Sequence, residues 1–304
     1  MRKTLMKRFT PVLLASLVAV GLSCSSLSYA QTIKVLTVSQ IRPTQPAIGD
    51  DEVNYKVATL QNDRQKLFED ICKDMGAKGV KTFDSQSSLT TPSSFSCLAA
   101  VGTDVDEVKS AVIAPDQHIY LTDGHHTVST YRALANNHDF PFAVRITNDF
   151  SHLASMDVFW STMQQQHLTW LEDPQGNTVT PAQLPQQVGL QAMQNDPYRS
   201  VVYFLRGIAY DKPDQAPPFL EFYLGSWLRD HQPVKSEQLS TKAGYMTYLQ
   251  QAASSLVAAQ GDEHATAADD SPSLSQLGQR ATVNKKKLAK LAEPGGKLSV
   301  LFNE

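Results

Sequence analysis

A short apolar run near the middle of the chain gives way to apolar residues at helical spacing. The run is Ile119–Leu121, which is β-prone, and Thr122–Gly124 separates it from residues 127–135, where apolar positions recur three or four apart. The run favours a strand and the later spacing favours a helix. The pattern therefore predicts a strand, a tight turn and a helix, and Gly124 can adopt the positive φ that such a turn requires.

The same patterning divides the chain into two halves. In the first we expect strands at 32–39 and 142–146, a strand or helix–strand transition at 105–113, and one helix from about Val53 to Met75. From Phe150 onward the spacing is helical, with helices expected at 151–170, 181–193, 197–208, 219–230 and 240–258. With 304 residues, 41% of them apolar, the chain can bury a full core. The pattern predicts an α/β (α+β) fold with a mainly helical C-terminal half.

The predicted turn at Gly124 has a chemical consequence. The first backbone N–H groups of the new helix, at His125, His126 and Thr127, have no intrahelical acceptor, and they point out of the helix together with the positive end of its dipole. Such a corner suits a phosphate or a carboxylate. We therefore predict an anion-binding corner that includes Asp123 and Gly124.

The two adjacent histidines fit this corner in more than one way. An empty helix N-terminus disfavours positive charge, so both imidazoles are expected to be neutral, whereas a bound anion favours imidazolium. Adjacent helical residues point about 100° apart, which makes His125 and His126 a poor chelating pair. The alternative interpretation is structural: Asp123 caps the helix and the imidazoles hydrogen-bond to backbone.

The first 30 residues have the pattern of a secretory signal peptide. Basic residues precede an apolar run, Pro11–Leu22, and Ser28–Ala30 ends the segment in a small-x-small cleavage pattern. The run is too short for a comfortable membrane span, and we see no span in the mature chain. We therefore expect export to the periplasm or the medium, with cleavage near Ala30. Lipid attachment at Cys24 is the minor alternative.

Cleavage changes both the charge and the cysteine count. Removing the four basic residues of the signal takes the formal charge from −3 to −7, which leaves no footprint for broad nucleic-acid binding. Two cysteines remain, Cys72 and Cys97. In an oxidising compartment an even pair favours a disulfide, although two buried free thiols would also fit the sequence.

A second group of polar residues lies between the first predicted strand and helix. Arg42 offers a planar guanidinium for an oxyanion, Lys56 a point charge, and Gln45 an amide between them. Each alone is more often a surface residue than a site. Beside the Asp-Gly-His-His corner, they predict further phosphate contacts.

Three segments together form a specific pattern: Arg42–Pro46, the run Asp51-Glu52-Val53 with Tyr55 and Lys56, and Leu121–Thr127. They resemble the ParB-like nuclease family of the ParB/sulfiredoxin superfamily. The likeness continues through the helical half, in the segments 196–199, 204–207, 221–223 and 227–229.

The resemblance implies a small domain with a curved sheet, over residues 31–149, in which the Gly-rich corner binds phosphate. A helical region, 150–304, is expected to pack on it. Sulfiredoxins carry a catalytic cysteine at the place of His125, so their thiol chemistry is not expected here. The corner also lacks the Arg/Glu pattern of ParB itself, and free serine kinases of the superfamily have a similar Asp-Gly-His-His corner.

These expectations lead to one preferred function and two alternatives. The preferred function is a phosphoester hydrolase or nuclease, in which His125 or His126 is the general acid or base and Asp123 orients an imidazole. Arg42, Gln45, Lys56, Gly124 and Thr127 would bind the phosphate. The spacing of the histidines supports no zinc site, so a loosely held divalent ion such as Mg²⁺ is the most that we expect. The alternatives are a non-catalytic protein that binds a phosphorylated or anionic ligand, and a phosphotransferase related to the free serine kinases.

Overall fold

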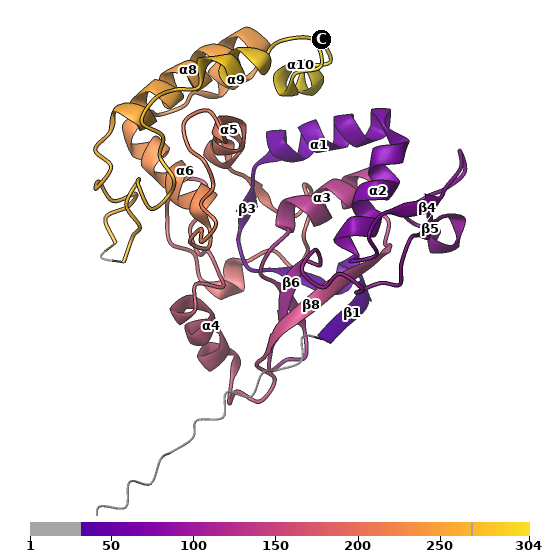
Figure 1. Cartoon of the computed structure of the whole chain (residues 1–304). Coiled ribbons are helices and arrows are strands. Elements are labelled where there is room, and N and C mark those ends of the chain that lie inside the picture. The colour runs from indigo at the N-terminus through magenta and orange to yellow at the C-terminus, as the bar shows by residue number, and fades with distance from the viewer. Residues whose placement is uncertain (1–31, 269) are drawn as a thin grey trace, which may run out of the picture. The chain divides into compact units, whose positions relative to one another are not determined.

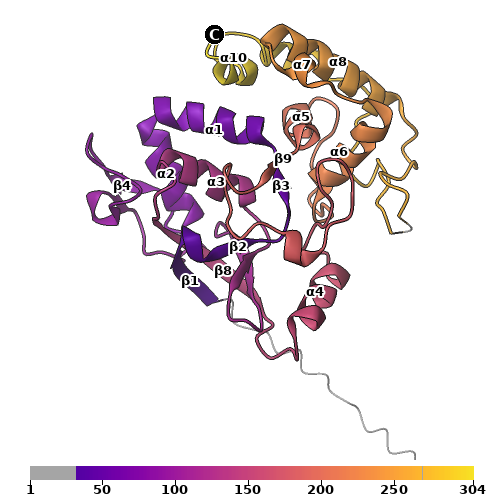
Figure 2. The ribbon, with the colours of Figure 1, turned by 180° about the vertical axis from the view of Figure 1, so that it is seen from behind.

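A mixed five-stranded sheet organises the first half of the chain (Figures 1 and 2). This computed structural model describes residues 32–268 and 270–304, so the expected signal peptide, its cleavage site and Cys24 lie outside the described residues. The strand order is β1 (Thr32–Thr37), β8 (Pro141–Asp149), β6 (Ser110–Ile113), β7 (Ile119–Leu121), β2 (Ile41–Pro43). The pairs β1–β8 and β6–β7 are antiparallel, and β8–β6 and β7–β2 are parallel.

Alternate residues of the central strands enter two different cores, because successive side chains of a strand point to opposite faces. Ala111 and Ile113 pack with the helices α1 (Asp50–Asn62), α2 (Arg64–Asp74) and α3 (His125–Leu134). Val112 packs on the other face with Phe159 of α4 (Met156–Gln165). The middle of the sheet is therefore covered on both faces, and the buried positions of its inner strands are mostly apolar.

The second half of the described chain is mainly helical, as expected. After α4, its helices are α5 (Pro197–Leu205), α6 (Leu220–His231), α7 (Ser236–Leu239), α8 (Lys242–Ala258), α9 (Lys285–Lys290) and α10 (Lys297–Leu301). Their apolar faces form a core of their own around Trp227, Tyr245 and Tyr248. In Figure 1, α10 lies beside α1, and α5 lies between α1 and α6. The α+β fold class is confirmed; the division of the chain at residues 149 and 150 stays a prediction.

Two short strand pairs and a disulfide tie loops to this frame. β3 (Ala47–Ile48) pairs with β9 (Gln194–Asn195), which links the start of α1 to the start of α5. β4 (Val80–Thr82) pairs with β5 (Ser96–Cys97). A disulfide joins Cys72 of α2 to Cys97, with their Cα atoms 5.6 Å apart. The expected pairing of these two cysteines is therefore present.

Some predicted helix boundaries are wrong, for reasons that lie in single residues. The helix expected from Val53 to Met75 is two helices, because Asp63 ends the first and its side chain accepts a hydrogen bond from Lys66 N to cap the second. The helix expected at 151–170 is present over Met156–Gln165 alone. The helix expected at 181–193 is a single 3-10 turn at Pro181–Gln183, since Pro185 and Gly189 (φ +140°) interrupt the rest.

Candidate functional site

The predicted strand–turn–helix corner is present at the junction of β7 and α3. Gly124 has φ +90° and ψ 14°, and it is the N-cap of α3. No side chain caps this helix, so Asp123 does not act as the cap that the structural interpretation assumed. The first helical bond runs from Val128 N to Gly124 O, at 2.9 Å. The N–H groups of His125, His126 and Thr127 are therefore the free end of the helix dipole.

A cavity of about 470 Å³ opens at this corner. It contains all but one of the residues that the sequence analysis assigned to catalysis or phosphate binding. The members that line it are Gln45, Lys56, Asp123, Gly124, His125, His126 and Thr127. The structure thus brings together residues of the β2–β3 loop, α1 and α3, and we call this space the corner cavity.

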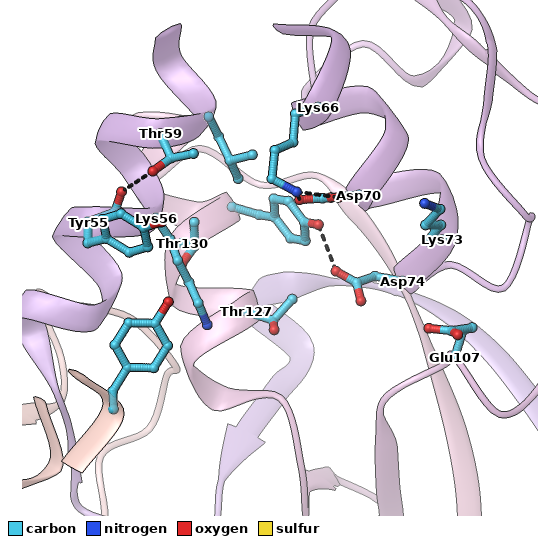
Figure 3. A pocket seen from close by; sticks show the side chains of 13 residues that line it. Tyr55, Lys56, Thr59, Lys66, Asp70, Lys73, Asp74, Glu107, Thr127 and Thr130 are labelled. Carbon is cyan, nitrogen blue, oxygen red and sulfur yellow. Dashed lines mark hydrogen bonds and ion pairs between the residues drawn. The ribbon is translucent and has the colours of Figure 1, made fainter. Parts of the chain in front are cut away.

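Lys56 and Thr127 also face a second pocket, of about 390 Å³, which lies between α1, α2 and α3. Figure 3 shows Lys56 and Thr127 approaching it from α1 and α3, opposite Asp74 of α2. The Tyr131 hydroxyl donates to Asp74 Oδ2 at 2.7 Å, and Lys109 Nζ lies 2.8 Å from Oδ1 of the same carboxylate. Most of the charged side chains of this second pocket form ion pairs, in part with residues that do not line it.

Both histidines are buried and hydrogen-bonded to backbone. Thr44 N donates to His125 Nε2 at 3.2 Å, and Gly49 N donates to His126 Nε2 at 3.0 Å. A neutral imidazole that accepts at Nε2 carries its proton on Nδ1. Burial lowers the pKa of His125 to about 3, and burial is also the main reason that the pKa of His126 lies well below its usual value. These low pKa values agree with the neutral imidazoles expected for His125 and His126 at a helix N-terminus.

Glu52 of α1 is a buried carboxylate. It belongs to the run Asp51-Glu52-Val53 that carries the family resemblance, but the sequence predicted no role for it. Its Oε1 lies 2.6 Å from Lys56 Nζ, and its Oε2 lies 2.8 Å from Arg199 Nη1 and 3.6 Å from His126 Nε2. Burial alone would raise the pKa of Glu52. The charges of Lys56 and Arg199 oppose this effect, and the pKa of Glu52 lies well below its usual range. The i,i+4 spacing of Glu52 and Lys56 was a usable sequence signal for the first of these pairs.

Three more cations of the helical half line the corner cavity: Arg199, Arg206 and Lys212. Arg206 forms an ion pair with Glu221, which also lines it. Arg199 is 7% exposed, and its Nε has no hydrogen-bond partner among the described residues. No local pattern assigns these cations to the corner, because Arg199 reaches it through the packing of α5 against α1, and Arg206 and Lys212 follow in the segment after α5.

Arg42 is the predicted phosphate contact that the structure does not bring to the corner. Its Nη2 lies 2.8 Å from His118 Nε2, and it lines two other cavities. The reason is strand geometry: Arg42 lies within β2 between Ile41 and Pro43, whereas the prediction placed it on a turn. Ile41 faces the core beneath α1–α3, so the next side chain, Arg42, faces the other side of the sheet with Tyr120.

Gln45, by contrast, lies where it was expected. It is 3% exposed, lines the corner cavity and donates from Nε2 to Ala47 O at 2.7 Å. Its amide therefore also stabilises the backbone of the loop between β2 and β3.

The donor set of the corner offers little to a metal ion. Within residues 32–268 and 270–304, no group of three or more His, Cys, Asp or Glu side chains is placed to hold one. The two buried carboxylates of the cavity are already paired with cations, Glu52 with Lys56 and Arg199, and Glu221 with Arg206. The residues present therefore do not fit a protein-held Mg²⁺ site.

Comparison with known protein families identifies the family of this chain. A family model described as "Putative ParB-like nuclease" matches residues 34–230, which is more than half of the chain. The chain belongs to this family. Its matched region includes the corner, Glu52 and Arg199, and it ends before α7–α10.

Other comparisons support the fold alone. The crystal structure of protein Atu1540 from Agrobacterium tumefaciens is similar, with a TM-score of 0.52 and 23% sequence identity over 74% of this chain and 91% of that chain. No curated protein matches. None of the helices in the described ranges is long and apolar enough to span a bilayer.

Proposed function

We propose that this ParB-like protein binds the phosphate group of an anionic ligand in the corner cavity. The observation that carries the proposal is the uncapped N-terminus of α3, which opens into a cavity lined by Lys56, Arg199 and Arg206. Backbone N–H groups and the helix dipole favour an anion there, and the guanidinium and ammonium groups add charge-assisted donors. The carboxylates of Glu52 and Glu221 pair with these cations and hold them in place.

The histidines have a supporting part in this proposal. With Nε2 of His125 and His126 accepting backbone N–H groups, both rings are fixed relative to α1 and the β2–β3 loop. The remaining ring proton, on Nδ1, is a donor. A general base needs a free nitrogen with a pKa near the working pH, and the pKa of each imidazole lies far below that. Binding is therefore the function that the geometry supports best.

Phosphoester hydrolysis is the second candidate, and the family description favours it. A bound phosphoester at α3 would lie beside two carboxylates of the cavity, Glu52 and Asp123. Asp123 is exposed and has no ion pair within the described chain, so it is free to orient or deprotonate a water. The cavity volume of about 470 Å³ lies within the range of small-molecule pockets.

Amide chemical shifts provide a direct test of binding. In a titration of the chain 31–304 with inorganic phosphate, the amide resonances of His125, His126 and Thr127 should shift and saturate. The start of α8 is an internal control, because Thr241 caps that helix by accepting from Gly244 N at 3.1 Å. Equal shifts at both helices, or none at α3, would overturn the proposal.

Turnover is tested separately. The same protein is incubated with phosphomonoesters, dinucleotides and single-stranded nucleic acid, with and without Mg²⁺ or Mn²⁺, and products are separated by chromatography. Product formation that Asp123→Asn abolishes would establish the hydrolase. Saturable phosphate binding with no product from any ester would leave a binding protein.

A further inference from the structure

A second cationic cavity lies next to the corner cavity, and the proposed function does not use it. Its volume is about 490 Å³, and it lies between the end of α5 and the segment from α9 to α10. Its charged lining is Arg206, Lys287, Lys290, Lys297 and Glu293. Figures 1 and 2 show α10 beside α1, near the C-terminus. We call this space the C-terminal cavity.

Arg206 is paired with Glu221, but the three lysines of the C-terminal cavity form no ion pair within the described residues. Lys287, Lys290 and Lys297 have no Asp or Glu oxygen within ion-pair distance in the described ranges, and Glu293 is the cavity's one carboxylate. By contrast, Lys66, Lys73, Lys109 and Lys242 each pair with a carboxylate. Unpaired cations that converge on a concave surface attract an anion.

Lys297 is half-buried and held in place, whereas Lys287 and Lys290 of α9 are exposed. Its Nζ lies 3.9 Å from the centroid of the Tyr203 ring, a cation–π contact that fixes the ammonium. Lys56 of the corner cavity lies over the same ring, 5.5 Å from its centroid. Burial lowers the pKa of Lys297 to about 8, as expected for an ammonium held without a carboxylate partner.

Arg206 joins the two cavities, because its side chain lines both. A ligand that reaches from α3 past Arg206 would place its next anionic group among Lys287, Lys290 and Lys297. α9 and α10 lie outside the family-matched residues 34–230, so the lysines of this second cavity belong to a part of the chain that the family model does not cover.

We propose that the C-terminal cavity holds a second phosphate group of the ligand whose first phosphate binds at α3, so that the ligand carries a chain of phosphates. This inference rests on the proposed function and narrows its ligand class. Phosphoanhydride chains and single strands of nucleic acid share this chemistry, and the test separates them.

The test compares inorganic phosphate, tripolyphosphate and a single-stranded trinucleotide in calorimetric titrations at fixed ionic strength. Wild-type protein should bind tripolyphosphate at least about tenfold more tightly than phosphate. The double variant Lys287→Ala/Lys290→Ala should bring that ratio close to one. The matched control is Lys285→Ala/Lys286→Ala, which removes the same charge from the same helix at positions that do not line the cavity, and should keep the ratio.

The outcomes separate this inference from the function on which it rests. Equal affinity for phosphate and tripolyphosphate, or equal losses in the two double variants, would overturn the second phosphate site, while phosphate-induced shifts at His125–Thr127 would still support the first. A trinucleotide that depends on Lys287 and Lys290 in the same way would support the inference and identify a nucleic-acid strand as the source. Dependence seen with tripolyphosphate alone would identify a phosphoanhydride chain.

Discussion

Gly124 sets the backbone geometry of the corner at the scale of a single residue. Its φ of +90° is one that residues with a Cβ resist, and a Cβ there would lie 2.6 Å from Lys109 Cγ. Gly124→Ala should therefore lower the free energy of unfolding by at least about 1–2 kcal/mol and weaken phosphate binding, measured by chemical denaturation and by titration. Gly295→Ala is the control, because its φ is +75° but nothing lies within 4 Å of the added Cβ. If both variants lose equally in stability and neither loses affinity, the shape of the corner does not matter for binding.

The histidines contribute to stability through the hydrogen bonds that they accept. His126→Ala leaves the Gly49 N–H without its acceptor, and His125→Ala does the same to the Thr44 N–H. Each change should lower the free energy of unfolding by about 1–3 kcal/mol, the cost of an unsatisfied buried donor. His138 is exposed, so His138→Ala should be neutral. Full stability with complete loss of turnover in either corner variant would instead restore the general-base role predicted from the sequence.

Sequence patterns identified the corner residues because their positions follow from local geometry. An Asp-Gly step between a β-prone run and a helical spacing has few alternatives, so Gly124 and the N–H groups after it could be predicted. Arg42 shows the limit of this reasoning. Its side chain faces away from the corner because β2 extends through it, and one residue of strand register decides the face.

At the scale of elements, the ion pair between Glu52 of α1 and Arg199 of α5 joins the two halves of the chain. Arg199→Met should lower the free energy of unfolding by about 3–5 kcal/mol at pH 7, since a buried charge loses its partner. The fold lowers the pKa of Glu52, so the stability that it contributes is present above its unfolded value of 4.5 and is lost as the pH falls below it. The difference in the free energy of unfolding between Arg199→Met and the wild type should therefore shrink as the pH falls below 4.5.

An exposed pair is the control for this prediction. Lys66 and Asp70 form an i,i+4 pair on α2 with Nζ 2.8 Å from Oδ2. Lys66→Met should cost about 0.3–0.5 kcal/mol. Urea denaturation of both variants between pH 3 and pH 7 makes the comparison. A loss for Arg199→Met as small as that for Lys66→Met would show that the buried pair contributes no net stability.

The disulfide acts between elements as well, because it ties α2 to the β4–β5 pair. Cys72 and Cys97 are 25 residues apart. Closing such a loop stabilises the fold by roughly 3–4 kcal/mol in the chain-entropy account. Reduction should lower the melting temperature, and Cys72→Ala/Cys97→Ala should melt at the temperature of the reduced protein. Two alkylatable thiols in native, oxidised material would contradict the pairing.

At the scale of the whole molecule, the binary pattern was enough for the fold class but not for the composition of the site. Alternation and helical spacing predict β7 and α3 locally. The convergence of Arg199, Arg206 and Lys212 on the corner depends on how α5 packs against α1, through contacts such as Arg199–Glu52, between residues 147 positions apart. Such contacts leave no periodic signal in one sequence. The sequence therefore did not predict that cations of the helical half line the corner cavity, and the structure was needed to find them.

We propose from the first 30 residues that the chain is exported from the cytoplasm. A basic start, the apolar run Pro11–Leu22 and the Ser28–Ala30 cleavage pattern predict a mature chain that begins at Gln31. An oxidising compartment would then allow the Cys72–Cys97 disulfide to form and persist. Protein expressed from the full sequence in a bacterial host should be recovered outside the cytoplasm, with Gln31 as the first residue in N-terminal sequencing. Ala30→Arg should block cleavage and leave uncleaved precursor, whereas Cys24→Ser should change nothing, because lipid attachment is not expected. Cytoplasmic protein that keeps Met1 and has Cys72 and Cys97 as free thiols would refute export, and lipid on Cys24 would refute cleavage at Ala30.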